Sequence, residues 1–324
     1  MKQNKMPPPR KSGITIGDFT VNFVRTCRVL EGKVNALPAG LGNFPVYNNV
    51  DFKSAIPSDW NPEGFFMPMY TQEALWLNFP KSFQENKLPS AAIIAAGNIN
   101  AVTCKQIQLK KNGTLDMQLE ETQNYVVVPP QPWLDGWKDK DDKIYQFVAA
   151  QMGSGQTVES QITGEEKFGG IQIAVFESLK KYHDDLKPLQ RPREHTLGLK
   201  NSFESYSGNS LGSMLYCCNA KSATKNLSAS PRSMGLGRGG EIKQKIYPDS
   251  HGLHVWKKSP TGIIQLYMVN SEDFKQITSQ APPPTPVTHE LYQKQGIPWF
   301  ELPDVKMGDT QGSDIFKDLN SVKY

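Results

Sequence analysis

The clearest feature of the sequence is the alternation of apolar and polar residues in short segments separated by glycine and proline. Residues 19–30 alternate around a bulge or change of register, residues 91–102 are apolar around a Gly97–Asn98 pair, and residues 263–269 are mostly apolar. Such segments indicate β-strands, and the Gly97–Asn98 pair indicates a turn. The 24 prolines and 26 glycines interrupt the chain too often for long helices.

A second strand-rich region runs from residue 131 to residue 175. We predict neighbouring strands at 157–163 and 170–176, joined by a charged turn at 164–169. Residues 110–114, Lys-Lys-Asn-Gly-Thr, are typical of a hairpin turn. The glycine-rich residues 235–240 are interpreted as a hinge that leads into a half-exposed strand at 241–247.

Only short helices are expected. The polar residues 180–185 are compatible with a helix, and residues 271–278 begin with Ser271 as the expected N-cap, followed by acidic residues. Residues 288–296 carry Thr288 at the expected cap and Gly296 at the expected C-terminal stop. Between these two segments, residues 281–286 read Ala-Pro-Pro-Pro-Thr-Pro and predict an extended polyproline conformation.

These patterns predict a β-dominated α+β protein, built as a β-sandwich or as two linked antiparallel sheets with a few short helices. We expect a flexible arm at 1–14, a β-rich core at 15–180, a variable insertion or linker at 181–233, a β-rich C-terminal part packed on the core at 234–305, and a tail at 306–324. Residues 15–305 then form either one domain with an inserted loop or a core with a C-terminal lobe.

The charge pattern argues against nucleic acid as a partner. The 36 basic and 32 acidic residues are interspersed and leave a net charge of +4. Proteins that read DNA or RNA usually concentrate basic residues on one face. We therefore expect no nucleic-acid partner.

Cysteine usage and the absence of long apolar runs predict the compartment. Cys27, Cys104 and the adjacent Cys217 and Cys218 lack the Cys-x-x-Cys spacing typical of metal sites. The longest apolar run, residues 91–96, is too short to span a membrane, and the first ten residues show no secretory signal. We expect a soluble, cytoplasmic protein with reduced cysteines, no resident metal or cofactor, and no membrane insertion.

Residues 235–240, Gly-Leu-Gly-Arg-Gly-Gly, resemble a phosphate-binding loop. That function requires a strand before the loop and the start of a helix after it, whereas a strand-like segment follows here. A further interpretation is a nest of backbone amides that binds an anion together with Arg238. The hinge interpretation remains preferred, and Arg238 is kept as a candidate ligand-binding residue.

The densest group of histidines suggests a second site. Asp249, His251 and His254 offer a carboxylate and two imidazoles within six residues. A metal site needs three or four converging ligands, and this spacing in a loop does not ensure convergence. We treat the three residues as ligand-binding candidates without a metal.

Two further groups are weaker candidates. Glu165 and Glu166 invite an acid–base function, but a charged turn accounts for both without any pocket. Trp133 and Asp135 lie in a Gln-Pro-Trp-Leu-Asp-Gly segment, where the indole offers a binding platform or an ordinary core anchor. The sequence contains no Gly-x-Ser-x-Gly and no His-Glu-x-x-His motif, which argues against the common serine and zinc hydrolases.

Several blocks of the chain resemble a group of uncharacterised proteins from bacteria and fungi. These blocks include Gln-Pro-Trp-Leu-Asp-Gly at 131–136, Thr-Gly-Glu-Glu-Lys-Phe-Gly-Gly-Ile-Gln-Ile at 163–173, and the segment from Met-Gly-Leu-Gly to Tyr-Pro-Asp at 234–249. The resemblance implies that the two halves of the chain belong to one unit and that residues 180–230 are a variable insertion. It implies no activity and no functional residues.

Two functions remain open from the sequence. The first is a non-catalytic binding or self-assembling protein that contacts a protein partner, or copies of itself, through sheet edges and through aromatic and proline-rich surfaces. The alternative is a ligand-binding protein or enzyme for a carbohydrate or phosphorylated compound, with a cleft between segments 153–170 and 235–254. The lack of a catalytic motif favours the first.

Overall fold

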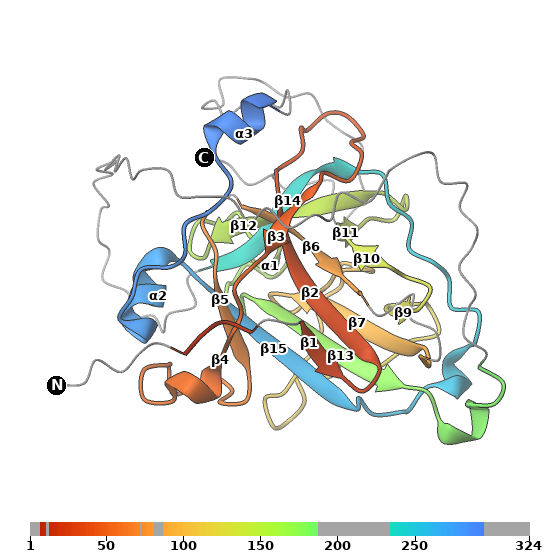
Figure 1. Ribbon diagram of the computed structural model, residues 1–324. Coiled ribbons are helices and arrows are strands. Elements are labelled where there is room, and N and C mark those ends of the chain that lie inside the picture. Colours follow the sequence, from red (N-terminus) through yellow and green to blue (C-terminus); the bar gives the residue numbers. More distant parts are fainter. Residues whose placement is uncertain (1–6, 11–12, 72, 81–86, 187–233, 295–324) are drawn as a thin grey trace. The chain divides into compact units, whose positions relative to one another are not determined.

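The computed structural model describes residues 7–10, 13–71, 73–80, 87–186 and 234–294, which fold mainly into antiparallel β-strands (Figure 1). Residues 187–233 of the predicted insertion and the whole predicted tail lie outside these residues, as does Gly296. The predicted β-dominated α+β class with a few short helices is confirmed.

The strands and helices are short, as the glycine and proline content requires. The strands are β1 (Ile14–Ile16), β2 (Phe19–Thr26), β3 (Gly40–Asn43), β4 (Tyr47–Asn48), β5 (Phe65–Pro68), β6 (Ala74–Asn78), β7 (Ser90–Ala96), β8 (Ile99–Asn100), β9 (Val126–Val128), β10 (Trp133–Leu134), β11 (Gly136–Lys138), β12 (Ile144–Gln151), β13 (Ile171–Glu177), β14 (Met234–Ile242) and β15 (Gly262–Val269). The helices are α1 (Val158–Thr163), α2 (Ser271–Thr278) and α3 (His289–Lys294), with 3-10 turns η1 (Asn49–Phe52), η2 (Lys180–Tyr182) and η3 (Leu253–Val255).

The strands form one hydrogen-bonded sheet with two halves. The order along the sheet is β1-β2-β6-β12-β14-β15-β13-β7-β8, and the other strands pair at the sides of this path. All pairs between these strands are antiparallel except β5 with β15. Strands β14 and β15 meet through a single residue pair, Met234 with Met268. The two halves are thus linked at one point, as in the predicted pair of linked sheets.

One apolar core receives side chains from both halves of the sheet. Phe23 of β2, Leu77 of β6 and Phe147 of β12 belong to the same buried cluster as Ile94 of β7 and Ile173 of β13. Complete burial of each such side chain contributes about 1.5–3 kcal/mol to folding, so this cluster is the main source of stability. The alternation along each strand directs every second side chain into it.

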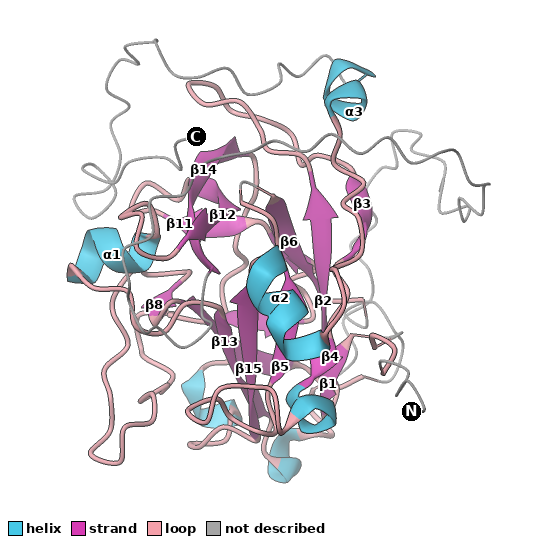
Figure 2. Cartoon of the chain, turned by 90° about the vertical axis from the view of Figure 1, so that its left-hand side faces the viewer, coloured by secondary structure: helices cyan, strands magenta, loops and turns pink. Residues whose placement is uncertain are grey.

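The outer faces of the sheet are covered by separate apolar clusters. Over β5 and β15, Phe274 of α2 packs with Phe66 of β5 and Tyr267 of β15, and Trp60 stacks on Tyr267 with ring centroids 4.0 Å apart and an interplanar angle of 3°. Figure 2 views the molecule from the side on which α2 lies. Farther along the same outer face, Trp256 belongs to a cluster over β7, β9 and β13. Each helix or loop therefore covers apolar residues that the strands leave on their outer faces.

The prediction of a strand at 157–163 is wrong, because this segment forms helix α1. The Thr157 hydroxyl accepts a hydrogen bond from the backbone N–H of Ser160 and caps the first turn. Gly164 ends the helix in a left-handed conformation. Val158 and Ile162 are four residues apart and face the main core together, so the same apolar positions that suggested a strand also fit one face of a helix.

The interpretation of residues 235–240 as a hinge is also wrong, because these residues lie within β14. The predicted strand at 241–247 overlaps with β14 only at Glu241 and Ile242. A Cβ atom on Gly240 would lie 2.5 Å from the carbonyl oxygen of Leu30, which crosses the strand at this point. Glycine is therefore required here by close packing of two backbone segments.

Other local predictions are confirmed, with one shift at a helix cap. Strands β7 and β8 flank the turn at Gly97 and Asn98, β15 spans the apolar 263–269, and residues 110–114 form a turn in which Lys110 donates to the Thr114 carbonyl. Helix α2 spans 271–278 as predicted, but its N-cap is Asn270, whose side chain accepts from two backbone N–H groups. Ser271 is its first residue.

After β14 the chain runs extended without a strand, and glutamine side chains hold it in place. Gln131 donates to the Lys245 carbonyl and accepts from the Tyr247 backbone N–H, with distances of 3.1 and 2.9 Å. Gln123 donates to the Tyr247 carbonyl and accepts from the Asp249 N–H. A primary amide offers the same donor and acceptor as a backbone peptide group, so each glutamine replaces a pair of sheet hydrogen bonds.

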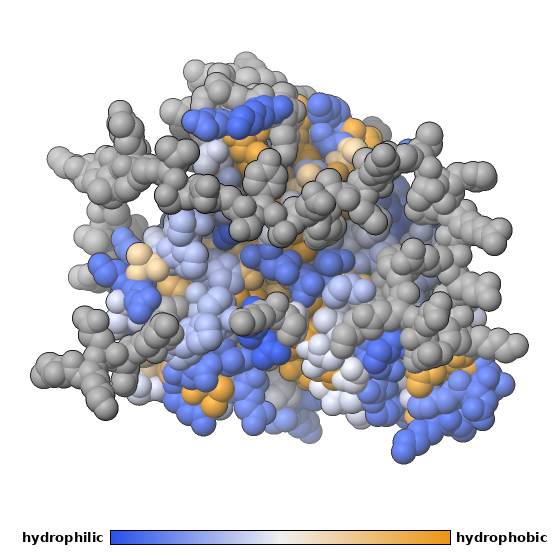
Figure 3. All heavy atoms as spheres, viewed as in Figure 1, coloured by the Kyte–Doolittle hydropathy of each residue, from blue (hydrophilic) through white to orange (hydrophobic). Residues whose placement is uncertain are grey.

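The surface of the described residues has no broad apolar patch of large side chains. The exposed large apolar residues are Val34, Val50, Leu109 and Ile263, which come from four separate segments. On the face drawn in Figure 3, apolar residues are interspersed with polar ones. No helix in the described part of the chain is long and apolar enough to span a membrane.

Candidate functional site

The candidate site is the proline segment, which we define as residues 281–288 between α2 and α3. Figure 1 shows it as the blue trace that leaves α2 and leads to α3. Pro283, Pro284 and Pro286 are exposed, whereas Pro282 and Thr285 are half-buried. Pro282 and Thr285 are three positions apart, which is the repeat of a polyproline helix, and Val287 is half-buried as well.

Thr285 anchors this segment to the sheet. Its hydroxyl donates a hydrogen bond to the Glu73 carboxylate at 2.5 Å and accepts one from the backbone N–H of Val287 at 3.1 Å. Among the described residues, the bond from Thr285 to Glu73 is the only hydrogen bond between the proline segment and the sheet. Proline has no N–H to donate, so an inward-facing hydroxyl is the natural anchor for such a segment.

Glu73 lies directly before β6 and is 4% exposed. Its second carboxylate oxygen accepts from the backbone N–H of Tyr70 at 2.9 Å. The Nε atom of Arg25 lies 2.9 Å from the first oxygen, an ion-pair distance, although the direction of its N–H bond does not satisfy hydrogen-bond geometry. Pairing of β2 with β6 places Arg25 opposite Leu75, next to this carboxylate.

Arg25 is held from its other side by an aromatic ring. Its guanidinium carbon lies 4.3 Å from the centroid of the Phe44 ring. A guanidinium over an aromatic face gains electrostatic attraction that is larger when the group is removed from water. Arg25 is 6% exposed, so the ring and the Glu73 carboxylate together compensate for its burial.

Burial is the largest influence on the pKa values of Glu73, Arg25 and Tyr70. It raises the pKa of the Glu73 carboxyl, although Arg25 and the hydrogen bonds from Thr285 and Tyr70 oppose the change. Burial also lowers the pKa of the Arg25 guanidinium, against the attraction of Glu73. The pKa of the Tyr70 phenol is raised by burial and by the negative charge of Glu73. The negative charge of Glu73 is thus stabilised by Arg25 and by the two hydrogen bonds, against the effect of burial.

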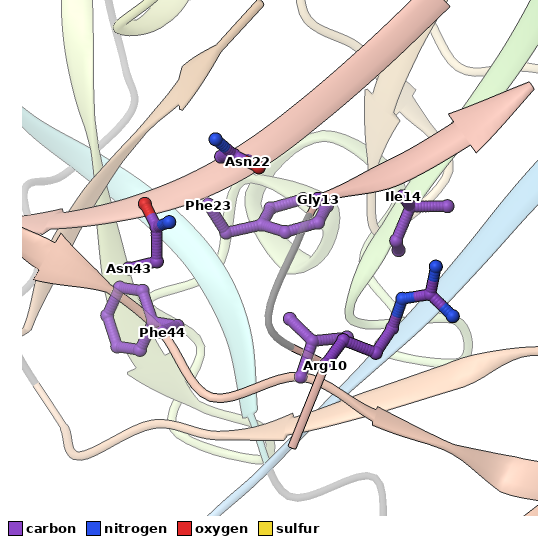
Figure 4. A pocket seen from close by; sticks show the side chains of 8 residues that line it. Arg10, Gly13, Ile14, Asn22, Phe23, Asn43 and Phe44 are labelled. Atoms are coloured by element: carbon purple, nitrogen blue, oxygen red, sulfur yellow. The ribbon is translucent and has the colours of Figure 1, made fainter. Parts of the chain in front are cut away.

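The cavity near Phe44 is too small for a substrate (Figure 4). Its volume is about 20 Å³, and Asn22, Asn43 and Phe44 are among the residues that line it. A cavity of this size holds about one water molecule. The side-chain oxygen of Asn22 is buried without a hydrogen-bond partner in the described protein, so it is the group that such a water would satisfy.

The structure places the predicted acids of the 164–169 turn in structural contacts. Glu166 accepts hydrogen bonds from the Gly153 N–H and from the Thr157 hydroxyl. Glu165 is exposed and forms an ion pair with Lys167. Neither residue lines the cavity near Phe44 or the larger one described below.

Arg238, Trp133 and Asp135 lie apart from these acids. Arg238 projects from the middle of β14 over the ring of Tyr145, with its guanidinium carbon 4.1 Å from the ring centroid. The Trp133 carbonyl accepts hydrogen bonds from the side chains of Gln131 and Gln244. Trp133 therefore lies beside the extended chain after β14 that Gln131 also holds. Asp135 is 0% exposed, and neither of its carboxyl oxygens has a hydrogen-bond partner among the described residues.

The Asp249 group serves as a loop anchor. The Asp249 carboxylate accepts from the Tyr125 hydroxyl at 2.7 Å and from the Trp256 indole at 2.8 Å. Burial alone would raise the pKa of Asp249, but these hydrogen bonds and those from the backbone outweigh it and lower the pKa. The His251 ring packs edge-on against Trp256, and His254 is exposed. Among the described residues, no three His, Cys, Asp or Glu side chains are grouped closely enough to hold a metal.

The predicted segments 153–170 and 235–254 do contact each other, but through packing. A Cβ on Gly235 would lie 2.8 Å from the Thr157 side chain. The eight predicted site residues are distributed over three regions of the fold. None of them lines either of the two cavities.

Sequence reasoning identified the proline segment but missed the residues beneath it. Arg25 continues the series of alternate positions that Phe19, Val21 and Phe23 fill with apolar side chains. A charged residue at such a position indicates a buried partner of opposite charge. Glu73 and Thr285 carry no comparable signal, because they meet only through tertiary structure. Glu159 was also missed: its carboxylate accepts from the backbone N–H groups of 167, 168 and 169 and holds the glycine-rich turn.

No protein-family model matches this chain, and neither a curated protein nor a solved structure matches it. The resemblance to a group of bacterial and fungal proteins therefore stays a prediction.

Proposed function

We propose that this protein is a non-catalytic binding protein that presents its proline segment to a protein partner. The observation that carries this proposal is the anchoring of Thr285 to the buried Glu73 while Pro283, Pro284 and Pro286 face solvent. The proline residues are fixed in φ and restrict the residue before them to extended conformations. An extended segment of this kind is a common ligand for aromatic grooves.

The exposed residues have the spacing that such grooves read. Pro283 and Pro286 are three residues apart and share one ridge of a polyproline helix, and Pro284 lies on the next ridge. The third ridge contains Pro282 and Thr285, which face the protein. A partner that reads two ridges can therefore bind while the third stays attached to the sheet.

Because the proline segment is anchored to the sheet, it loses less conformational entropy when a partner binds it. A free segment must be ordered on binding, at about 0.5–1.5 kcal/mol for each immobilised flexible side chain and more for the backbone. The Thr285 hydrogen bond and the fixed proline φ angles remove part of that cost before the partner arrives. The partner class is thus a small domain with an aromatic-lined groove that reads Pro-x-x-Pro.

The experiment is a titration of labelled SH3 and WW domains, as two probes of this class, with the full-length protein. We expect chemical-shift changes confined to the aromatic groove of at least one probe. Pro283→Ala and Pro286→Ala should weaken the effect at least about tenfold, because each removes one of the two prolines on the exposed ridge. The matched control is Pro62→Ala, which removes an exposed proline from a different loop.

Three outcomes count against the proposal. They are no shift in either probe, shifts outside the groove, and shifts that the variants at 283 and 286 leave unchanged. Circular dichroism of each variant separates lost binding from lost folding. The cytoplasmic location predicted from the sequence suits such a partner and stays a prediction.

Self-association at a sheet edge is a second candidate, favoured by β3. This strand pairs only with β2 among the described strands, and three of its four residues are exposed. An edge strand offers unpaired N–H and C=O groups to a second copy. Light scattering after size exclusion would show a concentration-dependent dimer that Leu41→Pro abolishes. A monomer at all concentrations would exclude this candidate.

A further inference from the structure

A second cavity, larger than the one near Phe44, lies beneath residues 103–120. Its volume is about 230 Å³, and it opens beside the outer face of β7. Ligand sites of drug size occupy roughly 300–1,000 Å³. This cavity therefore suits a smaller molecule.

Two buried asparagines build the frame of the cavity. The Asn100 side chain accepts from the backbone N–H groups of Val102 and Thr103 and donates to the carbonyl of Asn124. The Asn124 side chain accepts from the Glu120 N–H and donates to the Gln118 carbonyl. Because both amides bond to the backbone within the loop, they hold the walls of the cavity in place.

The wall combines an apolar side with a polar rim. Ile93, Ile107 and Met117 line the cavity, and Ile93 and Met117 are 1% and 2% exposed. Gln106, Gln108 and Gln118 line it as well and are exposed at its opening. A carbohydrate ring presents apolar C–H groups on one face and hydroxyls along its edge, and planar amides match adjacent hydroxyls with a donor and an acceptor.

The charges at the rim do not favour an anion. Lys105 is the one basic side chain in the lining, and Asp116 and Glu120 are acidic. Asp116 forms an ion pair with Lys110 at 3.5 Å, so its negative charge is already partly compensated. A ligand without net charge meets no unfavourable charge at this rim.

We infer that this cavity binds a small, uncharged, hydroxyl-rich molecule of about the size of a monosaccharide. This site is independent of the proline segment, because the two share no residue. A ligand this small is expected to bind with a Kd on the order of 1 mM.

Saturation-transfer difference NMR on the full-length protein tests the inference. The probes are D-glucose, D-galactose and N-acetyl-D-glucosamine at about 10 mM, above the Kd of about 1 mM expected for this size of ligand, with inorganic phosphate as the charged comparison in a competition arm. We expect a saturable signal from at least one sugar that phosphate does not displace. Gln108→Trp should abolish the signal, because the indole fills the opening, and Gln106→Ala should weaken it about threefold to tenfold by removing one amide.

The matched control is Gln276→Trp, which introduces the same side chain at an exposed position on α2. A signal that survives Gln108→Trp, or that Gln276→Trp removes equally, overturns the assignment of the site. Absence of a signal from all three sugars, or displacement by phosphate, overturns the assignment of the ligand class. If Gln108→Trp fails to fold, Gln106→Ala and Gln118→Ala decide the question, since both residues are exposed.

Discussion

Thr285 and Glu73 lie 212 positions apart in the sequence, and the hydroxyl of the first donates a hydrogen bond to the carboxylate of the second. This contact ties the segment that follows α2 to the beginning of β6. Glu73 is itself fixed by Arg25 and by the backbone of Tyr70. The exposed prolines thus rest on a rigid polar group instead of on a mobile loop.

The first prediction concerns the buried ion pair between Arg25 and Glu73. Arg25→Met and Glu73→Gln should each destabilise the fold by about 3–5 kcal/mol, because each removes one charge and leaves the other buried without compensation. The double variant should cost clearly less than the sum of the two, since no charge remains. Urea denaturation of the four proteins measures this difference. Additive effects would mean that the two residues do not act as a pair.

The second prediction isolates the anchor of the proline segment. Thr285→Val keeps the shape of the side chain and removes the hydroxyl, so the Glu73 carboxylate loses one donor at a cost of about 1–3 kcal/mol. Hydrogen exchange at Val287 should become faster, because its N–H donates to that hydroxyl. Thr285→Ser, which keeps the hydroxyl, is the control and should retain slow exchange. Equal exchange rates in the two variants would show that the hydroxyl does not hold the segment.

The strands could be predicted from the sequence where apolar alternation and turn residues agree. Residues 91–102 are an example, because the turn at Gly97 and Asn98 separates two apolar segments. The prediction failed at 157–163. The four-residue spacing of Val158 and Ile162 fits both a strand and a helix, and the caps at Thr157 and Gly164 favour the helix. It failed again at 235–240, where glycines serve close packing, which no local pattern reveals.

The candidate site was predictable only in part, for a related reason. The run of prolines that forms its exposed face is visible in the sequence. Its base is formed by Arg25 of β2 and by Glu73, directly before β6, and only the register of β2 with β6 brings them together. Register depends on the whole sheet, so a sequence without a structure cannot supply it.

The third prediction tests the close packing at β14. Gly240→Ala should destabilise the protein by more than 2 kcal/mol, roughly the upper range for an overpacked site, because its Cβ would lie 2.5 Å from the Leu30 carbonyl oxygen. Gly153→Ala is the comparison: no atom of the described residues would lie within 4 Å of the added Cβ, and the positive φ of 86° opposes the change at about 1–2 kcal/mol. Thermal unfolding ranks the two. A smaller effect at Gly240 would mean that the crossing backbone can move aside.

The fourth prediction concerns Asp135 and the pH dependence of stability. Burial raises the pKa of this carboxyl from 3.8 to about 8, although the nearby Trp133 indole opposes the change, and the side chain is 0% exposed. The folded protein therefore binds a proton that the unfolded chain releases near pH 4. Stability should fall as pH rises from about 4 to about 8 and then level off, with a total loss on the order of several kcal/mol.

Asp135→Asn removes the titrating carboxyl, so the stability of the variant should change less between about pH 4 and about pH 8. The variant should be more stable than the parent at pH 7.5, roughly in the middle of the physiological range, and similar to it near pH 4, where the carboxyl is already neutral. Asp184→Asn makes the same change at an exposed position and controls for the loss of a surface charge. Urea midpoints measured from about pH 4 to about pH 9 check both slopes. A parent protein whose stability rises with pH in this range would show that Asp135 is ionised in the folded state and that a donor has moved to meet it.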